Sequence, residues 1–128
     1  MKKCGIVLCD DQRAFRDVLS IALAVEPELE VLGEAADGEE AVRVVAALQP
    51  DIVLLDVAMP LMDGLEALPL MLESAPETQI VMLTGFASHD LRTRALSLGA
   101  CLFIEKGTNM PELVGQIKAL CRADVSVS

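Results

Sequence analysis

Short runs of apolar residues alternate along the chain with segments in which apolar residues recur at helical spacing. The runs are nearly continuous rather than interrupted by polar residues, which is typical of strands that are covered on both faces. We predict five such strands, at residues 5–9, 29–33, 51–55, 79–83 and 100–104. The segments after them predict helices, and the first of these has its apolar positions at Phe15, Val18, Leu19 and Ala22. The pattern therefore predicts five strands and five helices in strict alternation.

This alternation predicts the class of fold. The connection between two parallel strands through a helix is right-handed in nearly all proteins, so successive helices cover both faces of one parallel sheet. We therefore predict a doubly wound α/β domain with its second strand at an edge of the sheet. Ligands of such sheets bind at the carboxyl ends of the strands, near the point where the strand order reverses.

Several helix ends are marked in the sequence. Three helices are preceded by a side chain that can cap the helix and that lies three residues ahead of an acid. These pairs are Asp37 with Glu40, Asp63 with Glu66, and Asn109 with Glu112. Gly99 is placed to end the fourth helix. Pro69 interrupts the third helical pattern, and we expect it to kink that helix or to shift its start because a proline inside a helix removes a hydrogen bond.

Length and charge limit the classes of function. A chain of 128 residues has the size of one ordinary domain, which we assign to residues 1–122, with residues 123–128 as a tail or the start of a linker. The net charge of -10 repels phosphates, so we expect no direct binding of nucleic acid by this segment. The longest apolar runs are well short of the roughly 20 residues of a membrane span, so we expect no membrane association and a cytoplasmic location.

The cysteines give no sign of a metal or redox motif. Cys4, Cys9, Cys101 and Cys121 fall in or beside predicted strands and a helix, and their spacing contains no CxxC pair. A free cysteine behaves as a small hydrophobic residue. We therefore expect all four to be buried side chains that remain reduced.

Polar residues follow the strands at the edge of the sheet where ligands bind. Asp10 and Asp11 follow the first strand, Asp56 the third and Thr84 the fourth, and Lys106 comes shortly after the fifth. Adjacent carboxylates cost stability unless a positive charge lies between them. Three carboxylates with waters form an all-oxygen set, which favours a hard divalent cation, Mg²⁺ first and Mn²⁺ as an alternative. The sequence therefore predicts a cation site at this edge.

With these residues in place, the chain resembles the receiver domain of a two-component response regulator, and within that family the NarL/FixJ branch. The resemblance rests on Asp10-Asp11, GEAADGEEA at 33–41, LLDVAMPLMDG at 54–64, VMLTG at 81–85 and FIEK at 103–106. Together these stretches span nearly the whole chain in the expected order. The resemblance implies a flavodoxin-like doubly wound (βα)5 three-layer sandwich whose five-stranded parallel sheet has the order 2-1-3-4-5.

The resemblance also implies roles for the acidic residues. Asp56 would be the phosphoacceptor and would attack the phosphohistidine of a sensor histidine kinase, or a small phosphodonor, to form an acyl phosphate. Asp11, Asp56 and the backbone carbonyl of Ala58 would hold Mg²⁺, and Asp10 would ligate it through water. Phosphoryl transfer depends mainly on positioning and on neutralising charge, so such a domain catalyses its own phosphorylation and dephosphorylation and is not an enzyme in the usual sense.

Further roles follow from the same resemblance. Lys106 would place a positive charge on the phosphoryl oxygens, and Thr84 would swing inward to donate its hydroxyl to them, with Gly85 leaving room. Phe103 would then occupy the space that Thr84 vacates, which repacks a distant face. Phe86, two residues beyond Thr84, would flank the phosphoryl path. Our hypothesis is that it hinders the attacking water and prolongs the phosphorylated state.

Partners are implied as well. A sensor histidine kinase would supply the phosphoryl group, and a homodimer would form through the face made by the fourth helix, the fifth strand and the fifth helix. The chain would be the N-terminal receiver of a transcriptional regulator.

Other functions stay open at this point. A receiver-like domain could bind partners without being phosphorylated, either alone or within a larger protein. A Mg²⁺-dependent phosphohydrolase uses a similar Asp nucleophile but generally has a second acid or base two residues beyond it, where this chain has Ala58. A flavin-binding module of flavodoxin shape would need a phosphate loop where Asp10-Asp11 repel phosphate. The intact acids together with Thr84 and Lys106 favour a phosphorylated receiver.

Overall fold

The computed structural model describes residues 2–127 of the chain, in which strands and helices alternate as predicted. The strands are β1 (Cys4–Cys9), β2 (Leu29–Ala35), β3 (Ile52–Leu55), β4 (Gln79–Thr84) and β5 (Leu102–Glu105). The helices are α1 (Arg13–Ala24), α2 (Gly38–Leu48), α3 (Gly64–Ser74), α4 (His89–Ser97) and α5 (Met110–Val127).

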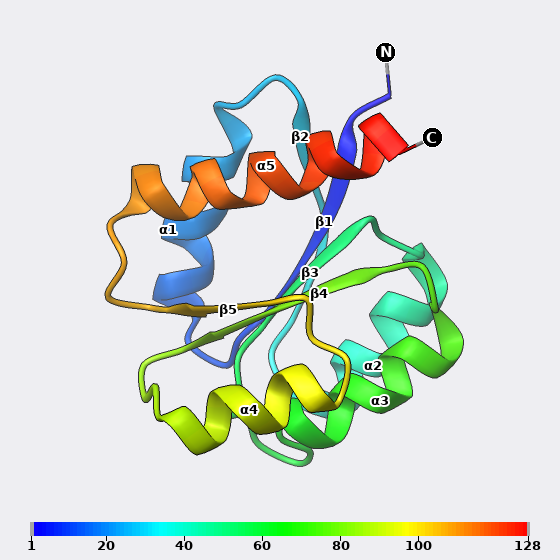
Figure 1. Ribbon diagram of the computed structural model, residues 1–128, viewed down its shortest axis with the longest axis vertical. Helices are drawn as coiled ribbons and strands as arrows, with labels where there is room; N and C mark the ends of the chain where they lie inside the picture. The colour runs from blue at the N-terminus through cyan, green and yellow to red at the C-terminus, as the bar shows by residue number, and fades with distance from the viewer. Residues whose placement is uncertain (1, 128) are drawn as a thin grey trace.

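The strands form one parallel sheet of five in the order β2-β1-β3-β4-β5, which confirms the predicted flavodoxin-like fold and strand order (Figure 1). Helices α1 and α5 cover one face of the sheet, and α2, α3 and α4 cover the other (Figure 1). The strand order reverses at β1 and β3. The carboxyl ends of these two strands therefore border the crevice in which a doubly wound sheet binds its ligands.

Both faces of the central strands are apolar. Ile6 and Leu8 of β1 pack in the cluster formed with α1 and α5, whereas Val7 and Cys9 pack in the cluster formed with the other three helices. Successive residues of a strand point to opposite faces, so a strand buried on both faces must be apolar at nearly every position. This arrangement explains the nearly continuous apolar runs of the sequence.

The apolar pattern departs from the prediction in β2 and α1. β2 lies at the edge and pairs only with β1, so its residues alternate in exposure and Leu32 is 40% exposed. The strand also continues to Ala35, past the predicted end at Gly33. In α1, Val18 belongs to the helical apolar pattern but is 55% exposed. Helical spacing alone therefore gave Val18 a core position that it does not occupy.

The helix ends agree with the predicted capping residues. The hydrogen bonds are Glu40 N to Asp37 Oδ1 at 2.8 Å, Glu112 N to Asn109 Oδ1 at 2.9 Å, and a reciprocal capping box between Asp63 and Glu66. Gly99 follows α4 with a φ of 115°, a conformation that glycine adopts at little cost. These signals are local in the sequence, which is why they could be found without the structure.

The ends of α3 and α5 bear on two further expectations. Pro69 lies inside α3, but the helix runs without a break from Gly64 and its start is not shifted from the cap at Asp63. α5 extends to Val127, into the segment that the sequence assigns to a tail or linker, and the domain boundary at residue 122 stays a prediction.

Within residues 2–127, no helix combines the length and the apolar character needed to cross a membrane.

Cys4 at the start of β1 and Cys121 in α5 form a disulfide, with their Cα atoms 6.1 Å apart. The expectation that all four cysteines are reduced is therefore wrong for this pair. Cys9 is free and buried, as expected, whereas Cys101 is free but exposed. The two bonded cysteines are 117 residues apart, and only the packing of α5 beside β1 brings them together (Figure 1).

Ion pairs hold the same part of α5 to the loop between α1 and β2. Lys118 Nζ lies 2.7 Å from Glu26 Oε1, and Arg122 Nη2 lies 3.4 Å from Glu28 Oε2. Water screens ion pairs near the surface, so each contributes little and the disulfide is the stronger of these links.

Candidate functional site

Two buried carboxylates lie where the central strands end. Asp10 N donates to Ala35 O at 3.0 Å, and Asp56 N donates to Cys9 O at 2.9 Å. The hydrogen bonds between neighbouring strands thus continue for one residue beyond β1 and β3, which fixes the backbone of both aspartates. Asp10 is 4% and Asp56 is 5% exposed. The sequence pattern of an apolar run followed directly by an acid therefore places charge at the edge of the core.

Asp11 completes a cluster of three acids. One carboxylate oxygen each of Asp10, Asp11 and Asp56 lie within 4.8 Å of one another, as the sequence predicts. Asp10 Oδ1 accepts a hydrogen bond from Gln12 N at 2.8 Å, whereas Asp10 Oδ2 is buried and accepts none from the described residues. Three carboxylates at this spacing, two of them buried, form an all-oxygen set that fits a hard divalent cation such as Mg²⁺.

Lys106 brings a positive charge to these acids. Its Nζ lies 2.6 Å from Asp10 Oδ2 and 3.2 Å from Asp56 Oδ2, so the ammonium pairs with both carboxylates. The same atom lies 3.3 Å from Gln12 Oε1 and 4.7 Å from the centre of the Phe15 ring. Because the Lys106 side chain is only 14% exposed, water screens these contacts weakly.

Burial and charge shift two pKa values in the site. Removal from water is the main cause that raises the pKa of Asp56, and the neighbouring Asp10 carboxylate raises it further. The Lys106 ammonium and the backbone N–H of Ala58 act in the opposite direction. Burial by itself lowers the pKa of Lys106, but its contacts with Asp10 and Asp56 outweigh burial and raise it. Lys106 is therefore a permanent cation that partly offsets the repulsion between the acids.

Thr84, Gly85 and Phe86 lead away from the end of β4. Thr84 is buried, its Oγ1 accepts a hydrogen bond from Phe86 N at 3.2 Å, and its backbone carbonyl accepts one from Lys106 N at 2.8 Å. Gly85 is exposed, and a Cβ added there would meet no protein atom within 4 Å. Packing within the chain thus does not require glycine at this position. Phe86 is 87% exposed.

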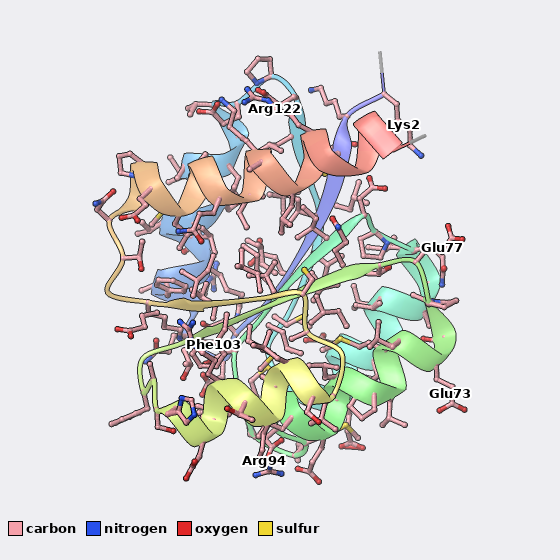
Figure 2. The ribbon with its side chains drawn as sticks, in the orientation of Figure 1. Lys2, Glu73, Glu77, Arg94, Phe103 and Arg122 are labelled. Carbon is pink, nitrogen blue, oxygen red and sulfur yellow. A yellow bond between two sulfur atoms is a disulfide. The ribbon has the colours of Figure 1, made fainter. Side chains whose placement is uncertain are left out.

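Phe103 lies on the face of the sheet that α4 covers (Figure 2). It is 6% exposed, and the guanidinium of Arg92 lies 5.5 Å from the centre of its ring. Such a cation–π contact favours one position of the ring. Arg94, on the same helix, points away from the sheet (Figure 2). Arg92 therefore covers the aromatic ring that the sequence analysis assigns to the switch.

The loop between β3 and α3 is held tightly against Asp56. Gly64 N donates to Val57 O at 2.8 Å, and a Cβ at Gly64 would overlap the backbone carbonyl of Asp56. Ala58, whose carbonyl the family resemblance assigns to the metal, lies in this loop and is exposed. The glycine after the Asp63 cap therefore fixes the backbone on which Asp56 and Ala58 lie.

Four residues near the site escaped the sequence analysis in this role, namely Gln12, Phe15, Arg16 and Arg92. Arg16 Nη1 donates to the backbone carbonyl of Asp10, and Arg16 Nε donates to Glu34 Oε1 at 2.9 Å. The spacing of Gln12 and Arg16 could have indicated their place. They are four residues apart at the start of the first helix, so they lie on one face of it. That face points to the strand ends.

A small pocket lies below the carboxylates, between β1 and α1. Its volume is about 10 Å³, and Asp10, Asp56, Phe15 and Arg16 are among its lining residues. This volume is the space of one water molecule. The pocket is therefore too small for an organic molecule.

A profile of the response regulator receiver domain matches residues 6–118. The chain is 39% identical over 109 residues to the transcriptional regulatory protein YhcZ of Bacillus subtilis, a match that covers 85% of this chain and 51% of YhcZ. It is similar to the signal receiver domain of NarL from Mycobacterium tuberculosis, with a TM-score of 0.88 at 29% identity, covering 95% of this chain and 98% of that one. It is also similar to a chain of the CheX–CheY–BeF₃–Mg²⁺ complex from Borrelia burgdorferi, with a TM-score of 0.85 at 27% identity, covering 91% and 87%.

The share of the relative that this chain covers differs between the curated proteins and the solved receiver structure. The chain spans about half the length of the curated relatives YhcZ and LiaR, but nearly the whole of the NarL receiver. The family match runs from β1 into α5 and therefore includes every strand and the acidic cluster. On this evidence the chain belongs to the response regulator receiver domain family, with relatives in the NarL branch.

Proposed function

We propose that this chain is a phosphorylation-controlled switch of a two-component system in which Asp56 accepts the phosphoryl group. The observation that carries the proposal is the cluster itself: one oxygen each of Asp10, Asp11 and Asp56 within 4.8 Å, with Lys106 Nζ 3.2 Å from Asp56. The two buried like charges of Asp10 and Asp56 lower stability, so their presence at a ligand-binding edge supports a role in chemistry.

In the proposed reaction, one Asp56 oxygen attacks the phosphorus of a phosphohistidine or of a small donor such as acetyl phosphate. The new O–P bond forms as the bond from phosphorus to the donor breaks, and the leaving imidazole or acetate departs with that electron pair. When bound by Asp10, Asp11, Asp56 and the Ala58 carbonyl, Mg²⁺ supplies positive charge that neutralises the phosphoryl oxygens. The protein's own contribution is to fix the backbone of Asp56 at the end of β3, beside the Lys106 ammonium.

Lys106 and Thr84 are placed to bind the product. The Lys106 ammonium already contacts two carboxylates and can turn one of these contacts toward a phosphoryl oxygen. Thr84 Oγ1 accepts from Phe86 N, which leaves the hydroxyl hydrogen available to donate. An added Cβ at Gly85 would meet no atom within 4 Å, so the chain leaves open space directly after Thr84.

We propose that Phe103 transmits this change to the face formed by α4, β5 and α5. The ring is buried under α4 and covered by Arg92, so a shift of Thr84 on the neighbouring strand β4 would alter its packing. The same face is the proposed surface of a homodimer. Interfaces of switches of this kind change when a local charge is added.

The proposed partners follow from the family. A sensor histidine kinase would donate the phosphoryl group, and the chain would be the N-terminal receiver of a transcriptional regulator, which the similarity to YhcZ and NarL supports. The net charge of -10 argues against direct binding of nucleic acid by this segment. We also propose a cytoplasmic location, a compartment in which a disulfide such as Cys4–Cys121 is unusual.

The structure gives little support to a phosphohydrolase. Ala58 cannot move a proton for a leaving group. The similar chain from Borrelia burgdorferi belongs to a CheX–CheY complex that contains BeF₃ and Mg²⁺. This similarity supports a signalling role. A domain that binds partners without phosphorylation is the remaining alternative.

Incubation with acetyl phosphate and Mg²⁺ tests the proposal. We expect the intact mass to rise by one phosphoryl group, stable in acid and labile in base, with no rise for Asp56→Asn. Asp17→Asn is the matched control, because Asp17 is an exposed aspartate of α1 away from the cluster, and it should be modified like the unaltered protein. An unmodified protein with intact fold would instead support the alternative without phosphorylation.

A further inference from the structure

Arg16 connects two elements beside the acidic cluster. Its side chain is 14% exposed, although it lies near the start of α1, where side chains usually reach into water. Nη1 donates to the backbone carbonyl of Asp10, and Nε donates to Glu34 Oε1 at 2.9 Å. Glu34 lies near the end of the edge strand β2. One guanidinium therefore joins the turn after β1 to the neighbouring strand.

The carbonyl that Arg16 contacts belongs to the peptide between Asp10 and Asp11. Rotation of that peptide would turn both carboxylates, because it changes ψ of the first residue and φ of the second. The other side of Asp10 is fixed already, since its N–H donates to Ala35 O at 3.0 Å. Arg16 thus provides the second backbone anchor of the acidic pair, and Ala35 and Glu34 place both anchors on β2.

We propose that Arg16 is a positioning residue for the divalent cation, which acts by holding the peptide between Asp10 and Asp11 in the orientation that presents both carboxylates. Outer contacts of this kind orient metal ligands in many proteins and affect affinity strongly when removed. This inference deepens the proposed function and depends on its cation site. It assigns no contact between Arg16 and substrate.

A simple charge effect would have the opposite sign. A guanidinium close to a cation site repels Mg²⁺, so removal of its charge alone should tighten binding. Removal of a backbone anchor should weaken binding, because the acids must then be ordered by the ion. The direction of the change therefore separates positioning from electrostatics.

The shape of arginine matters in the proposal as well. Two different nitrogens of Arg16 serve two acceptors, on Asp10 and on Glu34. The planar guanidinium fixes the direction of both hydrogen bonds, whereas the ammonium of lysine is a single point with flexible donors. Arg16→Lys keeps the charge and loses this geometry, so it should not restore tight binding.

Mg²⁺ affinity, measured by calorimetry on the folded protein without any phosphodonor, is the primary test. We expect Arg16→Gln and Arg16→Lys to weaken binding by about 10-fold or more. Arg13→Gln is the matched control, because it removes the same charge one turn earlier in α1 from a side chain that is 85% exposed, and its affinity should stay close to that of the unaltered protein. Thermal melting of each variant identifies a temperature at which all of them are folded, and the affinities are measured at that temperature.

Phosphorylation by acetyl phosphate at increasing Mg²⁺ provides the second test. If Arg16 positions the acids, the Mg²⁺ concentration for half-maximal rate rises by the same factor as the dissociation constant, while the rate at saturating Mg²⁺ changes little. A residue that only stabilises the fold would lower the melting temperature and leave the Mg²⁺ requirement unchanged.

Three results would overturn the inference. These are equal or tighter Mg²⁺ binding by Arg16→Gln, full recovery of affinity in Arg16→Lys, and an unaltered Mg²⁺ requirement in both. Should Arg16→Gln fail to fold, Arg16→Lys still decides the question. Failure of the proposed function is a separate outcome, because it would show as Mg²⁺ binding without any phosphorylation of Asp56, and the comparison of affinities would still hold.

Discussion

Lys106 Nζ lies 2.6 Å from Asp10 Oδ2, closer than its 3.2 Å to Asp56 Oδ2. No described residue donates a directed hydrogen bond to that oxygen of Asp10, so the ammonium is its charge partner in the absence of a divalent ion. One lysine from the end of β5 thus joins the ends of β1 and β3. Replacement of this lysine tests how much of the stability of the site depends on it.

Lys106→Met should destabilise the protein by roughly 2 kcal/mol in magnesium-free buffer, because it leaves two buried carboxylates uncompensated. Added Mg²⁺ should restore most of this loss by binding the same acids. Thermal melting with and without Mg²⁺ measures both effects. Lys3→Met, at an exposed lysine, is the control and should melt like the unaltered protein. Equal melting of Lys106→Met and the control without Mg²⁺ would contradict this prediction.

Asp56→Asn should melt above the unaltered protein at neutral pH without Mg²⁺. The pKa of Asp56 is raised in the folded protein. As pH rises, the folded state therefore keeps the Asp56 proton to a higher pH than the unfolded state does. The stabilising effect of this proton is present below the ordinary aspartate pKa of about 4 and is lost as pH rises through the raised value. The difference in melting temperature between variant and unaltered protein should therefore grow over that range. A constant difference would show that Asp56 carries no such penalty.

Two glycines near Asp56 should respond differently to alanine. Gly64→Ala should lower the melting temperature and the extent of phosphorylation, because its Cβ would overlap the Asp56 carbonyl. Gly85→Ala should leave the melting temperature unchanged, since nothing lies within 4 Å of its Cβ, but should slow phosphorylation by narrowing the path to Asp56. Gly115→Ala, an equally open position inside α5, serves as control and should stabilise the protein by about 0.5–1 kcal/mol. If Gly85→Ala is phosphorylated as fast as the unaltered protein, Gly85 has no role in access to Asp56.

Cys121→Ser should destabilise the protein by about 3–5 kcal/mol, because the disulfide closes a loop of 117 residues in the unfolded chain. A dithiol reductant should lower the melting temperature of the unaltered protein to a similar degree and leave Cys121→Ser unaffected. Cys101→Ser is the control, since Cys101 is exposed and free. If the reductant changes nothing, the two sulfur atoms are not bonded in solution.

Phe86→Glu should shorten the lifetime of the phosphorylated state. Phe86 is 87% exposed beside the end of β4, so it can shield the acyl phosphate from water without taking part in the core. The melting temperature should therefore stay the same, while the decay of the phosphorylated protein becomes faster. Decay is followed by intact mass after removal of the phosphodonor. An unchanged or longer lifetime would count against the hypothesis.

The strands and the acidic cluster could be predicted because each depends on a local signal, whereas the strand order came from the resemblance to receiver domains. Apolar runs that end in Asp10 and Asp56 mark both the strands and the edge at which they finish. The cap at Asp63 fixes the start of α3 in the same way, with Glu66 in return. The two edge strands were the exceptions: β2 continues two residues past its predicted end, and β5 begins at Leu102 instead of residue 100.

Contacts between distant residues could not be predicted in this way. The spacing of Cys4 and Cys121 carries no information about the packing of the last helix beside the first strand. Arg16 was missed because a guanidinium on a first helical turn is ordinarily solvated, and only the folded structure shows that it turns back to Asp10 and Glu34. The prediction for Val18 was wrong because helical spacing shows which face of a helix is apolar, but not how much of that face the rest of the protein covers.

The bridge between Cys4 and Cys121 also sets how the domain responds to mechanical load. Tension applied at the two bonded positions would pass through the sulfur atoms, and the chain between them would carry none of it. The central strands would then be protected from shear for as long as the bridge is oxidised. After reduction, the same pull would act on β1 itself, whose carboxyl end holds Asp10.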